Sequence, residues 1–141
     1  VHTFASPLVD PSLQELDDVD TAIVSLQFED GSVGVIDNSR RAVYGYDQRV
    51  ELFGSNAMVK AENVVQNTVV TATSQASTIA NPVKSLHRYK QAYFSELVDF
   101  IDSVINETET KCTFEDGIKA SQLAKAARKS FETGEKINLD N

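Results

Sequence analysis

The segment TAIVSLQFEDGSVGVIDN, residues 21–38, gives the clearest indication of the fold class. Residues 21–28 alternate between apolar and polar side chains, which predicts a half-buried strand. Its apolar face consists of Ala22, Val24, Leu26 and Phe28. Residues 29–31, EDG, predict a hairpin turn, because Asp-Gly readily adopts positive φ angles. Residues 32–38 return as the second strand, so the segment predicts an antiparallel hairpin.

Further strands are expected on both sides of this hairpin. They span residues 1–4, 48–55, 57–62 and 67–73. The last of them, NTVVTAT, is rich in the β-branched residues that strands favour. The polar stretch SQASTIANP, residues 74–82, is expected to be a loop that ends at Pro82.

Two helices are predicted after these strands. The first begins at Ser85, and its apolar residues recur every three or four positions. These residues are Leu86, Tyr89, Tyr93, Leu97, Phe100, Ile101, Val104 and Ile105. Thr113 and Asp116 resemble a capping box that opens the second helix, and Gly134 is expected to end it. The residues expected to face inward are Ala120, Leu123, Ala124, Ala127 and Phe131.

Strands followed by helices predict an α+β fold for residues 1–141 as a single domain. We expect an open, mainly antiparallel β-sheet with the two C-terminal helices packed on one face. Ile23, Ile36 and Phe53 are expected on the other face, so both faces carry apolar groups. This predicts a homo-oligomer formed through the sheet face, most simply a symmetric dimer. The alternative is a few scattered exposed apolar residues.

Composition excludes several classes of partner. The formal net charge of −8 argues against nucleic acid, because phosphate binding needs clustered cations. No apolar run approaches the ~20 residues of a membrane span, and no basic segment precedes an apolar core as in a signal peptide. Cys112 is the single cysteine, so no internal disulfide forms. We therefore expect a cytoplasmic protein with an inert, partly buried thiol.

The segment SRRAVYGYDQR, residues 39–49, contains more hydrogen-bonding and aromatic groups than a sheet connection needs. Tyr44 and Tyr46 share one face if the segment is extended. A phenol suits a polyol, because its hydroxyl donates and accepts while its ring covers a C–H face. The alternative is cross-strand aromatic packing. Arginines of the segment are expected mainly as ion-pair partners of Asp37, Asp47 or Glu51; they are Arg40, Arg41 and Arg49.

The chain carries neither a G-x-G-x-x-G nor a G-x-x-x-x-G-K-[ST] loop, the two common phosphate-binding loops. His2 and His87 lie far apart without a ligand at metal spacing, so no metal site is expected. From the residues alone, the chain is a sheet-and-helix domain without a catalytic set.

Residues 20–59 closely resemble the C-terminal domain of myo-inositol 2-dehydrogenases in the Gfo/Idh/MocA family of NAD(P)-dependent oxidoreductases. The most specific part is NSRRAVYGYDQRVE, residues 38–51, followed by the FGS turn. The helical stretches RYKQAYFSELVDFID and FEDGIKASQLAKAARKS are similar to the family's C-terminal end, so the resemblance covers nearly the whole chain.

The resemblance implies a parent protein with an N-terminal Rossmann domain, a catalytic lysine and an Asp-x-x-x-His pair, none of which this chain contains. That protein would oxidise a polyol CH–OH to a ketone and pass the hydride to NAD or NADP. This chain would form the substrate-side and oligomerisation domain, contact its own Rossmann domain, hold no cofactor and be inactive alone. The implied substrate-binding residues are Tyr46, Tyr44 and Arg40.

Two other readings remain open at this point. The same family could act on another sugar or inositol isomer, or the chain could be a non-catalytic assembly or carbohydrate-binding module. A G-x-G-x-x-G and a D-x-x-x-H upstream in the gene would distinguish an enzyme from a module. The choice between NAD and NADP is made by an acidic residue in the dinucleotide domain.

Overall fold

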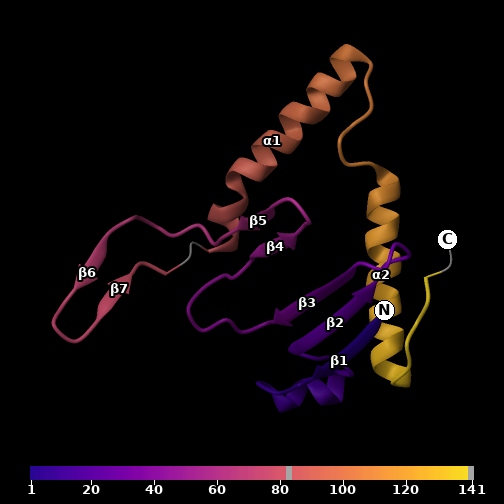
Figure 1. Cartoon of the computed structure of the whole chain (residues 1–141), viewed down its shortest axis with the longest axis horizontal. Coiled ribbons are helices and arrows are strands. Elements are labelled where there is room, and N and C mark those ends of the chain that lie inside the picture. The colour runs from indigo at the N-terminus through magenta and orange to yellow at the C-terminus, as the bar shows by residue number, and fades with distance from the viewer. Residues whose placement is uncertain (82–83, 140–141) are drawn as a thin grey trace. The chain divides into compact units, whose positions relative to one another are not determined.

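The computed structural model describes residues 1–81 and 84–139, and the chain packs as two compact units. Unit 1 comprises Val1–Arg41 and Glu109–Asn141, and unit 2 comprises Ala42–Thr108. The elements are labelled in Figure 1. Antiparallel strands precede two long helices, which confirms the predicted α+β class.

The sheet of unit 1 has three antiparallel strands in the order β1-β2-β3 (Figure 1). They are β1 (His2–Ser6), β2 (Thr21–Gln27) and β3 (Val33–Ser39). The predicted hairpin is confirmed, with Gly31 at φ 85° in its turn. A 3-10 helix, η1 (Pro11–Leu16), precedes β2 and was not predicted.

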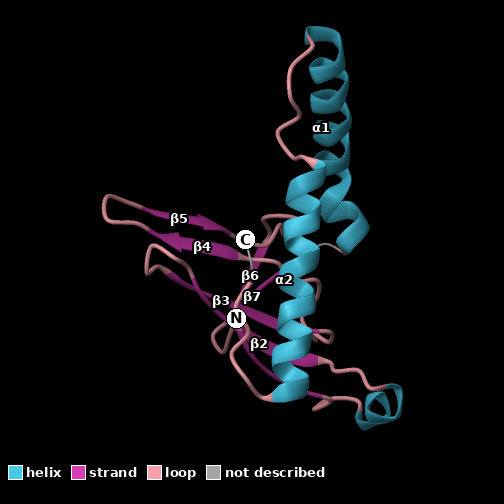
Figure 2. Ribbon diagram, turned by 90° about the vertical axis from the view of Figure 1, so that its right-hand side faces the viewer, coloured by secondary structure: helices cyan, strands magenta, loops and turns pink. Residues whose placement is uncertain are grey.

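Helix α2 (Phe114–Thr133) packs against β1 and, in Figure 2, runs in front of this sheet. The core beneath it is small. Val1, Val24 and Ala126 are its buried hydrophobic residues. Leu26, Leu123, Ala127 and Ile137 pack around them partly buried. The helix contributes the small side chains of Ala126 and Ala127 to this core, together with Leu123.

The ends of α2 follow the prediction. Thr113 and Asp116 form the reciprocal capping box, and Gly134 caps the C-terminus at φ 70°. The predicted inward face is wrong at two positions, because Ala120 and Ala124 are exposed. Their places are taken by Ala126 and Ser130, which are buried.

Ser130 explains part of that shift, because its hydroxyl is fully buried yet satisfied. It accepts the Thr3 N–H at 3.0 Å and donates to the Glu135 carbonyl at 2.6 Å. A polar residue in a helix is usually expected to face outward. Ser130 is tolerated inside because its hydroxyl both donates and accepts a hydrogen bond.

The face of the sheet away from Val24 also carries apolar groups. Ile36 was placed there wrongly, because it lies directly opposite Val24 and therefore on the same face. Phe4 and Ile23 are paired on the outer face, and Val35 follows one row along. All three are exposed in the chain, Phe4 at 66%.

Unit 2 contains two hairpins and a helix. The first hairpin pairs β4 (Val50–Phe53) with β5 (Met58–Ala61), and the second pairs β6 (Val70–Ala72) with β7 (Ser77–Ile79). Helix α1 (Ser85–Asn106) starts where it was predicted to start.

The expected loop over residues 74–82 is wrong in part, because residues 77–79 form β7; Pro82 lies outside the described residues. Thr73 closes the turn into this strand by donating its N–H to the Ala76 carbonyl at 2.8 Å. Thr78 and Ile79 then supply the β-branched side chains that strands favour. The polar surroundings masked this short strand in the sequence.

The predicted apolar face of α1 is uncovered within the chain. Its exposed members are Leu86, Tyr93, Leu97, Phe100, Ile101, Val104 and Ile105. No hydrophobic side chain among the described residues of unit 2 is buried. None of the helices in the described ranges is long and apolar enough to cross a bilayer.

Candidate functional site

The loop of residues 42–49 begins unit 2 and carries two of the three predicted site residues, Tyr44 and Tyr46. It turns rather than extends, because the Gly45 N–H donates to the Ala42 carbonyl at 3.2 Å and Gly45 adopts φ 128°. This region of φ favours glycine. The expectation that Tyr44 and Tyr46 share an extended face is therefore wrong. The two phenols bind different partners.

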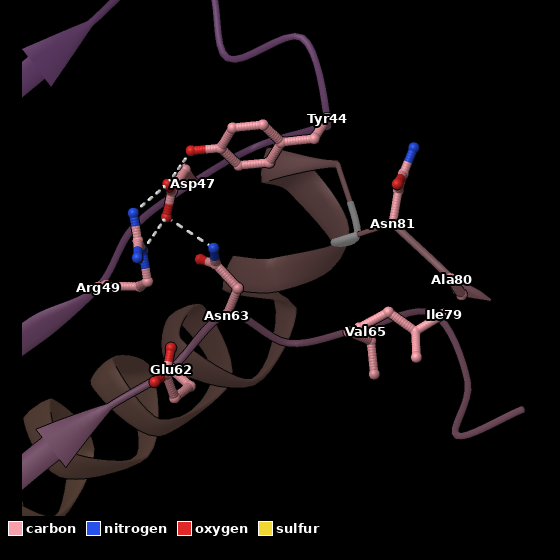
Figure 3. Close-up of a pocket in the computed structure, with 9 residues that line it drawn as sticks. All are labelled: Tyr44, Asp47, Arg49, Glu62, Asn63, Val65, Ile79, Ala80 and Asn81. Atoms are coloured by element: carbon pink, nitrogen blue, oxygen red, sulfur yellow. Dashed lines mark hydrogen bonds and ion pairs between the residues drawn. The ribbon is translucent and has the colours of Figure 1, made fainter. Parts of the chain in front are cut away.

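Tyr44 belongs to a cluster centred on the Asp47 carboxylate (Figure 3). Arg49 binds both carboxylate oxygens at 2.8 Å, and Asn63 donates its amide at 2.6 Å. The Tyr44 hydroxyl donates the fourth hydrogen bond. Asn63 also accepts the Gln48 N–H at 2.8 Å, which ties the loop to the residues after β5. We call Tyr44, Asp47, Arg49 and Asn63 the Asp47 cluster.

The charge state of this cluster follows from its hydrogen bonds. The Arg49 guanidinium, aided by Tyr44 and Asn63, holds the pKa of Asp47 well below the ordinary value of 3.8. The hydrogen bond to Asp47 raises the pKa of Tyr44. Asp47 is therefore an anion and Tyr44 a neutral hydrogen-bond donor at neutral pH.

The Asp47 cluster borders a hollow of about 420 Å³ in unit 2 (Figure 3). The other lining residues are Glu62, Val65, Ile79, Ala80 and Asn81. Carboxylates, amides and a phenol beside short apolar side chains provide the mixture of groups that a polyhydroxylated ligand needs. Tyr44 contributes to this lining, whereas Tyr46 is not part of it.

Tyr46 instead meets the first turns of α1. Its hydroxyl lies 2.9 Å from that of Tyr89, and the two rings meet edge to face at 5.8 Å. The Tyr89 hydroxyl donates to Gln48 Oε1. Arg88 reaches the same residue, with Nη2 2.7 Å from the Gln48 carbonyl and Nε 3.3 Å from Oε1. We call Tyr46, Tyr89, Gln48 and Arg88 the tyrosine relay.

The arginines of the segment divide between the units. Arg49 pairs with Asp47 as predicted. Arg40 belongs to unit 1 and pairs with Asp18 at 2.8 Å, so the predicted partners Asp37, Asp47 and Glu51 are wrong for this residue. The Arg40 backbone N–H also donates to the Asp20 carbonyl at 2.8 Å.

Four residues of the two networks were not predicted: Gln48, Asn63, Arg88 and Tyr89. Tyr89 was read as one more apolar position of α1, although it is half-buried and its hydroxyl is bonded twice. In the sequence, the one indication that Tyr89 has a polar role is that it directly follows Arg88 at the start of the helix.

His, Cys, Asp and Glu are the side chains that could hold a metal ion. Within residues 1–81 and 84–139, no group of three or more His, Cys, Asp and Glu is arranged to hold a metal ion. Cys112 is exposed, so the expected partial burial is wrong; it lies in the segment between α1 and α2, outside both helices. His87 is exposed at the start of α1.

Comparison with known proteins identifies the chain's relatives. The model of the oxidoreductase family, C-terminal alpha/beta domain, matches residues 2–139. The myo-inositol 2-dehydrogenase of Thermotoga maritima is 44% identical over 141 residues, which cover 99% of this chain and 42% of that protein. Myo-inositol dehydrogenase from Corynebacterium glutamicum superposes with a TM-score of 0.92 at 34% identity, covering 99% of this chain and 43% of that one.

A third relative carries ligands. The structure of myo-inositol dehydrogenase from Lactobacillus casei in complex with NAD(H) and myo-inositol has a TM-score of 0.73 at 25% identity, covering 87% of this chain and 37% of that one. The chain spans 39–42% of the length of the curated relatives that it matches. It therefore belongs to the Gfo/Idh/MocA oxidoreductase family, as a C-terminal alpha/beta domain.

Proposed function

We propose that this chain is the substrate-side and oligomerisation domain of an NAD(P)-dependent dehydrogenase that oxidises an inositol CH–OH to a ketone. The observation that carries the proposal is the match along almost the whole chain to proteins named myo-inositol 2-dehydrogenase. The same relatives are more than twice as long as this chain, so the remaining machinery is assigned to the rest of the parent protein.

The cofactor is assigned to an N-terminal Rossmann domain, because this sequence has no G-x-G-x-x-G loop. When bound there, NAD supplies the acceptor for the hydride. The residues of this chain suit the polyol rather than the cofactor. Tyr46 presents a phenol that is 39% exposed, on a loop held by hydrogen bonds between Tyr46 and Tyr89 and from Gln48 to Asn63.

Tyr44 and Arg40 are the further candidates for substrate contact. Tyr44 lines the 420 Å³ hollow with its hydroxyl bonded to Asp47, so its ring rather than its proton is what it offers a ligand there. Arg40 already pairs with Asp18, so a polyol hydroxyl would share its guanidinium with that carboxylate. Tyr46 therefore ranks first.

The test uses the full-length protein and follows NADH formation with myo-inositol, scyllo-inositol and unrelated sugars. A relative from Bacillus subtilis named scyllo-inositol 2-dehydrogenase, at 27% identity, justifies the second substrate. We expect the largest kcat/KM for an inositol. Equal or higher kcat/KM with an unrelated sugar would contradict the inositol assignment.

The contribution of Tyr46 is tested by Tyr46→Phe in the same protein. Loss of one hydrogen bond predicts a fall in kcat/KM of about two- to tenfold, with the dissociation constant of NAD unchanged. Tyr93→Phe is the matched control. Tyr93 also lies on α1, one turn after Tyr89, and its side chain is 60% exposed. If Tyr46→Phe keeps the wild-type kcat/KM, Tyr46 has a packing role only.

The oligomerisation role is proposed from the outer face of the unit 1 sheet. Phe4, Ile23 and Val35 are exposed there on adjacent strands. Large apolar side chains gathered on one sheet face are typical of a surface that another subunit covers.

A further inference from the structure

The tyrosine relay determines where the phenolic protons lie. Arg88 Nε is a donor without acceptor capacity, and it contacts Gln48 Oε1 at 3.3 Å. The Gln48 atom at this position must therefore be the amide oxygen and not the amide nitrogen. An amide oxygen accepts only, so the Tyr89 hydroxyl donates its proton to it.

A phenol has a single proton. Since the Tyr89 proton is directed to Gln48, Tyr89 has none to offer to Tyr46. The two hydroxyls are nevertheless 2.9 Å apart, a normal hydrogen-bond distance. Tyr46 must be the donor of that bond, and the Tyr89 oxygen must be its acceptor.

This direction leaves Tyr46 with an unshared lone pair and no free proton. Its side chain is 39% exposed, so the lone pair is accessible to a ligand. We infer that Tyr89 is a positioning residue which holds Tyr46 as a hydrogen-bond acceptor, so that Tyr46 takes a hydroxyl of the polyol as donor. The inference rests on the proposed function and adds the direction of the hydrogen bond.

The direction has a chemical consequence for recognition. A hydroxyl can donate to Tyr46, whereas fluorine in its place accepts weakly and never donates. Fluorine and hydrogen at the contacted carbon should therefore be equally poor replacements in the wild-type protein. If Tyr89 is removed as acceptor, the Tyr46 proton is released and fluorine becomes the better replacement.

The experiment measures kcat/KM of the full-length enzyme with inositols in which one non-reacting hydroxyl is replaced by hydrogen or by fluorine. The contacted position is the one whose deoxy analogue loses no further kcat/KM in Tyr46→Phe, as in a double-mutant cycle. The readout is the ratio of fluoro to deoxy kcat/KM at that position. Comparing this ratio between variants cancels the inductive effect of fluorine on the chemical step.

We expect the ratio to rise about twofold or more in Tyr89→Phe, the low end of what one hydrogen bond contributes. Gln48→Met, which removes the acceptor from Tyr89, should raise the ratio as well, because Tyr89 then has a proton for Tyr46. Gln48→Glu keeps an acceptor and should keep the wild-type ratio. Tyr93→Phe, outside the relay, should also keep it.

The outcomes separate the two proposals. An active enzyme in which no hydroxyl couples to Tyr46, or in which Tyr89→Phe leaves the ratio unchanged, overturns the inference and leaves the dehydrogenase function standing. A wild-type enzyme that oxidises no polyol overturns both. A higher ratio in Tyr89→Phe and Gln48→Met, with the wild-type ratio in Gln48→Glu, supports the inference.

Discussion

Units 1 and 2 are held together by different kinds of interaction. Unit 1 has a small core of buried side chains around Val24 and Ala126, and a buried serine with both hydrogen bonds made. Among the described residues of unit 2 no hydrophobic side chain is buried, and its strands form separate two-stranded hairpins. Isolated two-stranded hairpins are marginal in water. Unit 1 is thus organised by burial, whereas unit 2 is organised by polar networks around Asp47 and Tyr46.

We propose that this difference reflects two roles within the domain. Unit 1 would provide a stable packed base, and unit 2, with its exposed polar groups, would provide the surface that a ligand meets. This division can be tested at four places in the domain, in order of decreasing effect.

The outer face of unit 1 should give the largest effect. Ile23→Asp places a charge where we propose that another subunit packs. An uncompensated buried charge costs on the order of 3 kcal/mol or more, which is over a hundredfold in the dissociation constant of the oligomer. Sedimentation of the full-length protein measures this. Ser121→Asp, an exposed position on α2, is the control, and an unchanged oligomer in Ile23→Asp would refute the proposed interface.

Ser130→Ala should weaken unit 1 from within. It leaves the buried Thr3 N–H without an acceptor, which costs about 1–3 kcal/mol. Amide hydrogen exchange in the full-length protein should show lower protection in β1 and α2, because their contact depends on this hydroxyl. Ser121→Ala on the exposed side of the same helix should change protection little. Equal effects from the two substitutions would contradict the role of Ser130.

Two glycines of α2 should respond with opposite signs. Gly134→Ala forces a side chain into φ 70° and should cost about 1 kcal/mol. Gly117→Ala lies within the helix with open space around the added methyl group, so it should stabilise unit 1 by about 0.5–1 kcal/mol. Chemical denaturation of both variants gives the difference. If the free energy of unfolding changes in the same direction in both variants, the positive φ at Gly134 does not determine the stability of the helix end.

The smallest effect concerns pH and unit 2. The pKa of Asp47 is lowered by Arg49 in the folded state, so its contribution to stability is present above the ordinary carboxyl pKa of 3.8 and is lost as the pH falls below it. Asp47→Asn should remove this acid sensitivity from the loop of residues 42–49. The carboxyl-carbon NMR titration of Asp47 checks the direction. A midpoint at or above 3.8 would contradict the Asp47 cluster as described.

The sequence predicted what local interactions control. Three features depend on residues that are close together in the sequence, and the structure confirms all of them. They are the Asp-Gly turn of the hairpin, the Thr113–Asp116 capping box and the start of α1. The family resemblance was equally legible, because it depends on contiguous motifs.

The parts that were missed depend on distant partners. The tyrosine relay joins Tyr46 to a helix residue 43 positions later, and no local pattern encodes that pairing. The turn at Gly45 depends on a positive φ, and the presence of a glycine in a sequence does not show which φ it adopts. Ser130 read as an outward polar residue, because its acceptor and donor bonds involve Thr3 and Glu135 rather than its own helical neighbours.

The order of synthesis gives the split arrangement of unit 1 a further meaning. Its two segments flank unit 2 in the sequence, and the bonds that join them span 127 and 136 residues, from Ser130 to Thr3 and from Ile137 to Val1. Contacts of such long range form late, because the intervening chain must first be made and its ends brought together. On the ribosome, the β2–β3 hairpin therefore waits with Val24 uncovered while all of unit 2 emerges. Among the described residues the hydrophobic core forms around Val24 and Ala126, and it is complete only when α2 arrives. A truncation before Ser130 should therefore yield an aggregation-prone nascent protein rather than a smaller folded one.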